Sequence, residues 1–106
     1  MQVEVLPDTT ETHLKLGIIG ELDAISAPKL YENLNRFLQQ YSSARQITLN
    51  CRGLTYLSSA GAGILLMSID NLTPRGITLE LVEVQPEVYN ILDLLGLTKL
   101  MPVNHV

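Results

Sequence analysis

The stretch Gln46 to Leu72 reads QITLNCRGLTYLSSAGAGILLMSIDNL and decides the fold. Its first part, Gln46 to Cys51, is apolar and rich in strand-forming residues, which predicts a central strand. The segment RGLTYLSS predicts a loop or tight turn. Residues from Ser59 to about Leu72 predict a helix, which Pro74 and Gly76 then end. The stretch therefore predicts a strand, a turn and a helix in direct succession.

The residues before this stretch predict two strands and one helix. Val3 to Leu6 and His13 to Ile19 have the composition of strands, and Gly20 marks the end of the second. Ser26 is a candidate N-cap, and Pro28 suits the first helical turn because its missing N–H would have no partner there. Apolar residues then recur at the spacing of an amphipathic surface helix, at Leu30, Leu34, Phe37, Leu38 and Tyr41.

The residues after the central stretch continue the alternation of strands and helices. Ile77 to Val84 alternates as a strand does, Pro86 opens a third helix, and Gly96 is a plausible left-handed C-cap before a short edge strand in the tail. Such alternation implies crossover connections. The sequence therefore predicts a single α/β domain over residues 1–106, with a mixed, largely parallel sheet of four to five strands and helices packed on one side.

Composition excludes several classes of function. The chain has 106 residues and a net charge of −4, and its seven Lys and Arg are scattered along the sequence. Binding to a nucleic-acid backbone needs a cluster of positive charge, so we expect no nucleic-acid partner. The longest apolar run, Ala60 to Met67, is too short to cross a bilayer, and the N-terminus lacks the features of a signal peptide, so we expect a cytoplasmic protein. The only cysteine, Cys51, is expected to be a small buried residue.

The start of the predicted second helix carries the strongest functional signal. Ser58 and Ser59 stand there together, whereas one serine is enough to cap a helix. Gly61 and Gly63 follow within one turn, although glycine costs about 1 kcal/mol relative to alanine inside a helix. Bare backbone at this place favours close approach, either by a partner protein or by the sheet of the chain itself.

The same helix is apolar nearly all round. Its probable core stripe is formed by Leu65, Ile69 and Leu72, and Met67 points away from that stripe on a helical wheel. An apolar side chain exposed beside a polar helix start indicates a docking surface for a partner.

Three segments together resemble a known family. The GELD turn at residues 20–23, the segment ITLNCRGLTYLSSAGAGILL and the LLGL segment at residues 94–97 are similar in order to the STAS domains of anti-sigma factor antagonists, over about Leu14 to Leu100. The resemblance implies a STAS-like fold. It also implies that the unphosphorylated protein binds an anti-sigma factor that is a serine kinase, and so frees the sigma factor.

The resemblance also implies which residues carry the switch. Aligning Gly61 with the turn glycine of the family places the phosphorylated serine at Ser59, with Ser58 as a minor alternative acceptor. A metal-dependent serine phosphatase would restore the active form, and no cofactor or bound metal is expected in the chain itself. The expected partner-binding residues are Asp23, Ser58, Ser59, Gly61, Ala62 and Met67, and Asp23 has turn formation as an equal alternative role.

Two other functions compete with this interpretation. An exposed serine at a strand-to-helix turn is typical of a nucleophile elbow, but Leu57 stands at its first glycine position, and the only histidines, His13 and His105, lie in a predicted strand and in the tail. No acidic, His and Cys cluster has metal-ligand spacing. We therefore expect no enzyme. A non-switching STAS scaffold of a signalling assembly or of a membrane transporter is the second alternative.

Overall fold

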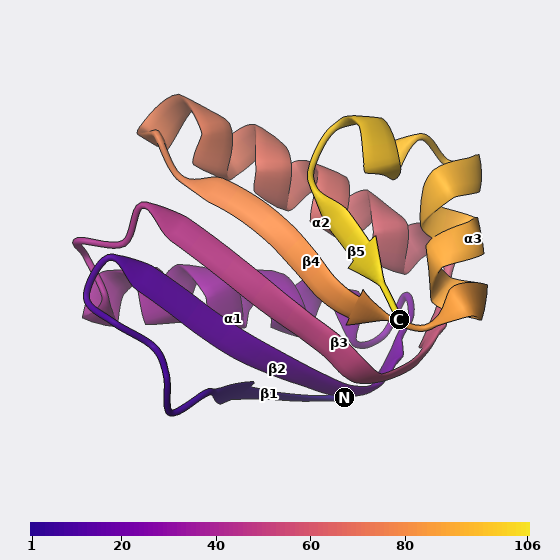
Figure 1. Ribbon diagram of the computed structural model, residues 1–106, viewed down its shortest axis with the longest axis horizontal. Helices are drawn as coiled ribbons and strands as arrows, with labels where there is room; N and C mark the ends of the chain where they lie inside the picture. The colour runs from indigo at the N-terminus through magenta and orange to yellow at the C-terminus, as the bar shows by residue number, and fades with distance from the viewer.

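The computed structural model describes residues 1–106, which form five strands and three α-helices around one sheet (Figure 1). In chain order the elements are β1 (Gln2–Val5), β2 (His13–Leu22), α1 (Ala27–Gln40), β3 (Gln46–Leu57), α2 (Ser59–Leu72), the 3-10 turn η1 (Thr73–Arg75), β4 (Thr78–Val84), α3 (Pro86–Leu94), the 3-10 turn η2 (Leu97–Lys99) and β5 (Val103–His105).

The sheet confirms the predicted topology. Its strand order is β1-β2-β3-β4-β5, with β1 antiparallel to β2 and every other neighbouring pair parallel. Each parallel pair is joined by a crossover through a helix, as parallel strands require. Figure 1 shows α1 and α2 behind the sheet and α3 beside its end. The predicted helix from Ser59 to Leu72 has the bounds of α2.

One face of the sheet packs on the helices and forms the core. Leu14 and Leu16 of β2, with their neighbours on β3 and β4, are buried there against apolar side chains of α1 and α2. Cys51 lies in this core as predicted. Burial raises the pKa of its thiol to about 12, so the thiol stays protonated and unreactive near neutral pH.

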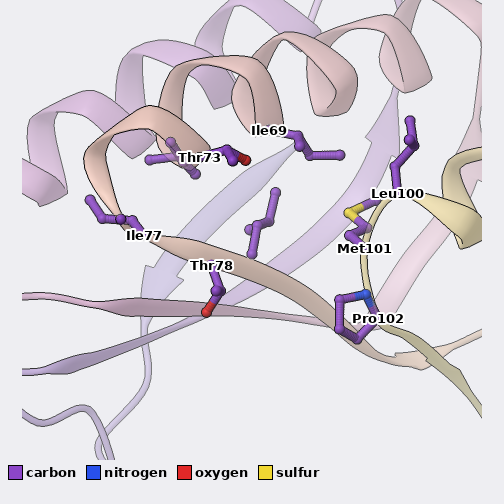
Figure 2. Close-up of a pocket in the computed structure, with 10 residues that line it drawn as sticks. Ile69, Thr73, Ile77, Thr78, Leu100, Met101 and Pro102 are labelled. Atoms are coloured by element: carbon purple, nitrogen blue, oxygen red, sulfur yellow. The ribbon is translucent and has the colours of Figure 1, made fainter.

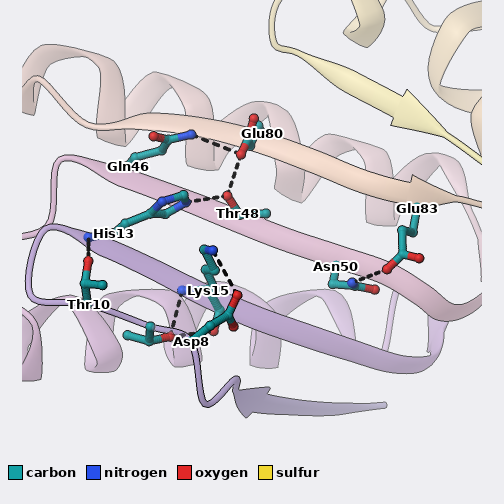
Figure 3. Close-up of polar contacts among 10 residues, drawn as sticks. Asp8, Thr10, His13, Lys15, Gln46, Thr48, Asn50, Glu80 and Glu83 are labelled. Atoms are coloured by element: carbon teal, nitrogen blue, oxygen red, sulfur yellow. Dashed lines mark hydrogen bonds and ion pairs between the residues drawn. The ribbon is translucent and has the colours of Figure 1, made fainter.

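The other face of the sheet is open and carries polar side chains that bind one another (Figure 3). His13 Nε2 lies 2.6 Å from Thr48 Oγ1, which donates a hydrogen bond of 2.6 Å to Glu80 Oε1. Gln46 Nε2 also donates to that carboxylate, at 3.0 Å. Nearby, Lys15 pairs with Asp8 at 2.9 Å. These polar groups therefore satisfy each other on this face.

Two strands run further than the sequence pattern predicts. β2 continues past Gly20 to Leu22, and β3 continues past Cys51 to Leu57, so the segment that was expected to be a loop is a strand. The two extensions pair with each other, for example Leu22 with Leu57. Register shifts interrupt this pairing, and they remove the regular alternation by which a strand is recognised in a sequence.

Candidate functional site

The carboxyl ends of β2 and β3 lie side by side, and each leads directly into a helix. β2 enters α1 through a turn at residues 23–26, while β3 enters α2 at Ser58. The N–H of Ser58 donates a hydrogen bond of 3.0 Å to the carbonyl oxygen of Leu22, which ties the two connections together. In open α/β sheets, binding sites form beyond the carboxyl ends of such strands. This edge is therefore the candidate site.

Ser58 and Ser59 have different roles at the start of α2. Ser58 is the N-cap, with extended backbone angles, and its Oγ accepts a hydrogen bond of 3.1 Å from the N–H of Gly61. Ser59 is the first helical residue, is exposed, and its hydroxyl forms no hydrogen bond within the chain. The N–H groups of Ser59 and Ala60 are likewise free, as in any first helical turn. The fold uses one serine and leaves the other available.

Removing the cap gives the first testable prediction. Ser58→Ala is expected to lower the free energy of unfolding by about 1 kcal/mol, because the N–H of Gly61 loses its acceptor. Ser59→Ala serves as the matched control and is expected to leave it unchanged within about 0.5 kcal/mol. Urea denaturation followed by circular dichroism measures both. Equal losses in the two variants would contradict the assignment of Ser58 as the cap.

Asp23 builds the neighbouring turn. Its Oδ1 accepts hydrogen bonds of 3.0 Å from the N–H groups of Ile25 and Ser26. These hydrogen bonds hold the pKa of the Asp23 carboxyl below its usual range, and the bond from the N–H of Ser26 has the largest effect. Asp23 is therefore ionised at neutral pH. Turn formation, the alternative role given to Asp23, is thus its role within the fold. Ser26 is the N-cap residue of α1, as predicted, but its side chain forms no capping hydrogen bond, because its hydroxyl donates to the carbonyl of Glu21, at 2.8 Å.

The burial of Gly61 and Ala62 corrects the expectation that they offer bare backbone to a partner protein. Both are buried, and a Cβ on Gly61 would lie only 2.5 Å from the carbonyl oxygen of Leu22. The glycine therefore serves close packing of α2 on the end of β2, and neither residue is accessible to a partner in this structure. Gly63, by contrast, is exposed, and a Cβ added there would have no atom within 4 Å.

Exposed apolar side chains lie on the same face of α2 as the free serine and in the neighbouring turn. Along α2, Ser59, Gly63 and Met67 recur every four residues on the exposed face, and Met67 is 52% exposed. Of the expected core stripe, Leu65 and Leu72 are buried and Ile69 partly so.

In the adjacent turn, Ile25 is 83% exposed, a feature that sequence periodicity missed because a single apolar residue in a turn has no period. We call the following residues the Ser59 surface: Asp23, Ile25, Ser58, Ser59, Gly63, Leu66 and Met67.

Neither histidine forms a hydrogen bond with a residue of this edge. His13 contacts Thr48 on the open face of the sheet, and the ring of His105 packs edge-on against Tyr89. The structure contains no group of three or more His, Cys, Asp or Glu side chains that could hold a metal ion. None of the helices has the length and apolar character needed to span a bilayer. What the edge offers is an exposed hydroxyl beside apolar side chains, an arrangement suited to binding and modification.

Comparison with known proteins finds relatives over almost the whole chain. A family model described as the STAS domain matches residues 2–105. The anti-sigma F factor antagonist of Paenibacillus polymyxa is 27% identical over 90 residues, which are 85% of this chain and 76% of that protein. The anti-sigma-B factor antagonist of Staphylococcus aureus is 26% identical over 104 residues, 98% of this chain and 94% of that protein.

Solved structures share the fold. The anti-sigma factor antagonist SpoIIAA in its unphosphorylated form superimposes with a TM-score of 0.76 at 22% identity, covering 96% of this chain and 85% of that one. The phosphorylated form of the Bacillus protein superimposes with a TM-score of 0.68 at 20% identity, covering 96% and 88%.

Proposed function

The chain belongs to the STAS domain family, and we propose that it is an anti-sigma factor antagonist whose unphosphorylated form binds an anti-sigma factor that is also a serine kinase. Binding frees the sigma factor for transcription. The kinase then phosphorylates Ser59 and the complex dissociates, and a metal-dependent serine phosphatase restores the binding form. The observation that carries this proposal is the exposed Ser59 hydroxyl, which the fold does not use.

The geometry of the helix start supports Ser59 as the phosphate acceptor in preference to Ser58. The hydroxyl of Ser58 is half-buried and accepts the hydrogen bond from Gly61, so a phosphate there would disturb the cap. A phosphate on Ser59 instead lies at the positive end of the dipole of α2, near free N–H groups. The folded chain is therefore expected to accept the modification without rearrangement.

Phosphopeptide mapping tests the proposal. The purified chain is incubated with ATP and an extract of the cells it comes from, and is then recovered and digested. The expected result is phosphate on Ser59 in wild type and none in Ser59→Ala, with a serine kinase retained by the unphosphorylated chain. Phosphate on Ser58 alone would show that the assignment is wrong by one residue. A chain that takes up no phosphate and retains no kinase would favour the non-switching scaffold.

Met67 provides a test of the docking surface. Met67→Lys is expected to weaken kinase binding by roughly ten- to hundred-fold, because a buried methionine side chain contributes about 1.5–3 kcal/mol and a lysine cannot replace it. The melting temperature should change little, since the side chain is half exposed in the free chain. Isothermal titration and a melting curve measure the two effects.

The matched control for Met67→Lys is Leu94→Lys. Leu94 is also an apolar residue; it lies at the end of α3, outside the Ser59 surface, and is 85% exposed. Kinase binding should be unchanged in this variant. A sharp fall in the melting temperature of Met67→Lys would instead place Met67 in the core.

A further inference from the structure

The sheet has an empty place beside the first half of β4. β5 pairs with β4 only at Leu81 and Val84, because the chain before β5 turns away toward η2 instead of running along β4. A cavity of about 240 Å³ remains between the start of β4, the end of α2 and residues 100–102. Figure 2 shows Ile69, Thr78 and Leu100 on three sides of it. We call this cavity with the adjoining edge of β4 the β4 slot.

The backbone of β4 presents unpaired groups to the slot. Successive residues of a strand direct their N–H and C=O groups to opposite edges. The N–H of Thr78 donates to the carbonyl of Arg45 on the β3 side, at 3.0 Å, and that of Leu81 donates to Pro102 on the β5 side, also at 3.0 Å. Leu79 therefore directs its N–H and C=O toward the slot, where no strand of the chain lies beside it.

The walls of the slot are apolar. Six of its ten lining residues are hydrophobic, and Leu100 among them is 56% exposed. An extended peptide in the slot would bond to the backbone of Leu79 and cover Leu100 and Ile69 with alternate side chains. This combination of an open strand edge with apolar pockets is the one by which proteins bind peptides through strand addition.

Cations flank the slot in a chain that is otherwise acidic. Arg75 and Lys99 directly precede the lining residues Gly76 and Leu100. Both cations are exposed and neither forms an ion pair, since the two ion pairs of the structure involve Lys15 and Arg52.

Two carboxylates also adjoin the lining residues. Glu80 is bound by Thr48 and Gln46 on the open face, whereas Asp70 is exposed directly after Ile69 and leaves a net positive charge when counted against Arg75 and Lys99.

We propose that the β4 slot binds an extended segment of a partner protein, apolar at its centre and acidic at its ends, which adds a strand beside Thr78 to Glu80. The free backbone of Leu79 selects an extended conformation, the cavity selects apolar side chains, and the two cations select acidic flanks. The slot adjoins the end of α2, whereas Ser59 begins that helix, about 20 Å away along its axis. The proposal is therefore independent of phosphorylation at Ser59.

Hydrogen exchange with a synthetic peptide tests the proposal. The probe is the acetylated and amidated peptide Glu-Val-Thr-Val-Thr-Val-Glu, added to the ¹⁵N-labelled chain, and the control peptide carries N-methyl groups along its backbone. Exchange of the Leu79 amide is expected to slow by about tenfold or more at saturation, while that of Thr78, already bonded to β3, stays the same. The N-methylated peptide should give no protection.

Substitutions around the slot provide matched controls. Leu100→Glu and Arg75→Glu are each expected to weaken peptide binding by about tenfold, because one places a carboxylate on the apolar wall and the other reverses a flanking charge. Leu94→Glu and Lys29→Glu make corresponding changes at exposed positions outside the slot and should bind as wild type does.

Two outcomes would overturn the proposal. The first is no binding at millimolar peptide, or spectral changes confined to other residues. The second is protection of Leu79 that rises with protein concentration and needs no peptide, which would assign the slot to a second copy of the chain.

Discussion

Phosphorylation of Ser59 is expected to lower the affinity for the kinase partner by roughly 30-fold to several thousand-fold. The phosphate adds about −1.5 to −2 charges at neutral pH. In the complex it would have to lose its water against a surface that receives a small hydroxyl and the apolar side chains of Ile25 and Met67. An unpaired charge buried in an interface costs about 2–5 kcal/mol, which corresponds to the stated range.

The fold itself is expected to tolerate the phosphate. The N–H groups of Ser59 and Ala60 have no acceptor in the chain, and the start of α2 is the positive end of its dipole. A negative charge there is stabilising by about 0.3–1 kcal/mol. The melting temperature should therefore stay the same or rise slightly, which separates loss of binding from loss of structure.

Titration of five forms against the purified kinase measures the effect: the unmodified chain, the phosphorylated chain, Ser59→Asp, Ser59→Ala and Ser42→Asp. Ser59→Asp should reproduce part of the loss, since it carries one charge and fewer acceptors than a phosphate, while Ser59→Ala should bind as the unmodified chain does. Ser42→Asp is the control, because it places the same charge on an exposed serine after α1, at the other end of the sheet. Equal affinity of all forms would mean that Ser59 is only a helical residue, and the scaffold function would replace the switch.

Gly61→Ala is expected to lower the free energy of unfolding by about 2 kcal/mol or more. The added Cβ would lie 2.5 Å from the Leu22 carbonyl oxygen and 2.9 Å from Leu57 Cδ1. A backbone atom cannot rotate away, so α2 and the end of β2 must separate, and the hydrogen bond from Ser58 to Leu22 lengthens. This loss exceeds the gain of about 1 kcal/mol that alanine brings to a helix.

Gly63→Ala is the matched control two residues further along α2. It adds the same methyl group where no atom lies within 4 Å, so only the helix-forming effect remains, and the chain should gain up to about 1 kcal/mol. Urea denaturation of the two variants and wild type gives both values. Stabilisation by both substitutions would show that α2 lies further from β2 than described.

The sequence predicted the helices well because their ends depend on neighbouring residues. The signals that act within one turn are Ser58 and Ser59 at the start of α2, the prolines in the first turns of α1 and α3, and the left-handed Gly96 after α3. The second half of β3 was missed because its pairing with β2 contains bulges, which break the alternation of buried and exposed residues.

The site was only partly predictable for a similar reason. A small residue at position 61 suits either a partner or close packing inside the chain, and the choice depends on the carbonyl of Leu22, which is distant in sequence. The roles of Ser58 and Ser59 likewise depend on which hydroxyl reaches the N–H of Gly61. The exposure of Ile25 follows from the turn that Asp23 holds, and no periodic pattern reports it.

The separation of the cap from the free serine has a consequence for evolution. Ser58 and Gly61 maintain the fold, whereas Ser59, Gly63 and Met67 face solvent, where substitutions usually change stability by less than about 0.5 kcal/mol. Duplicated genes can therefore diverge at these three positions while each product stays folded. Under the proposed function, parallel pathways in one cell would thus acquire mutually insulated recognition from a shared scaffold, with cross-talk between them set by a few exposed side chains on one helix.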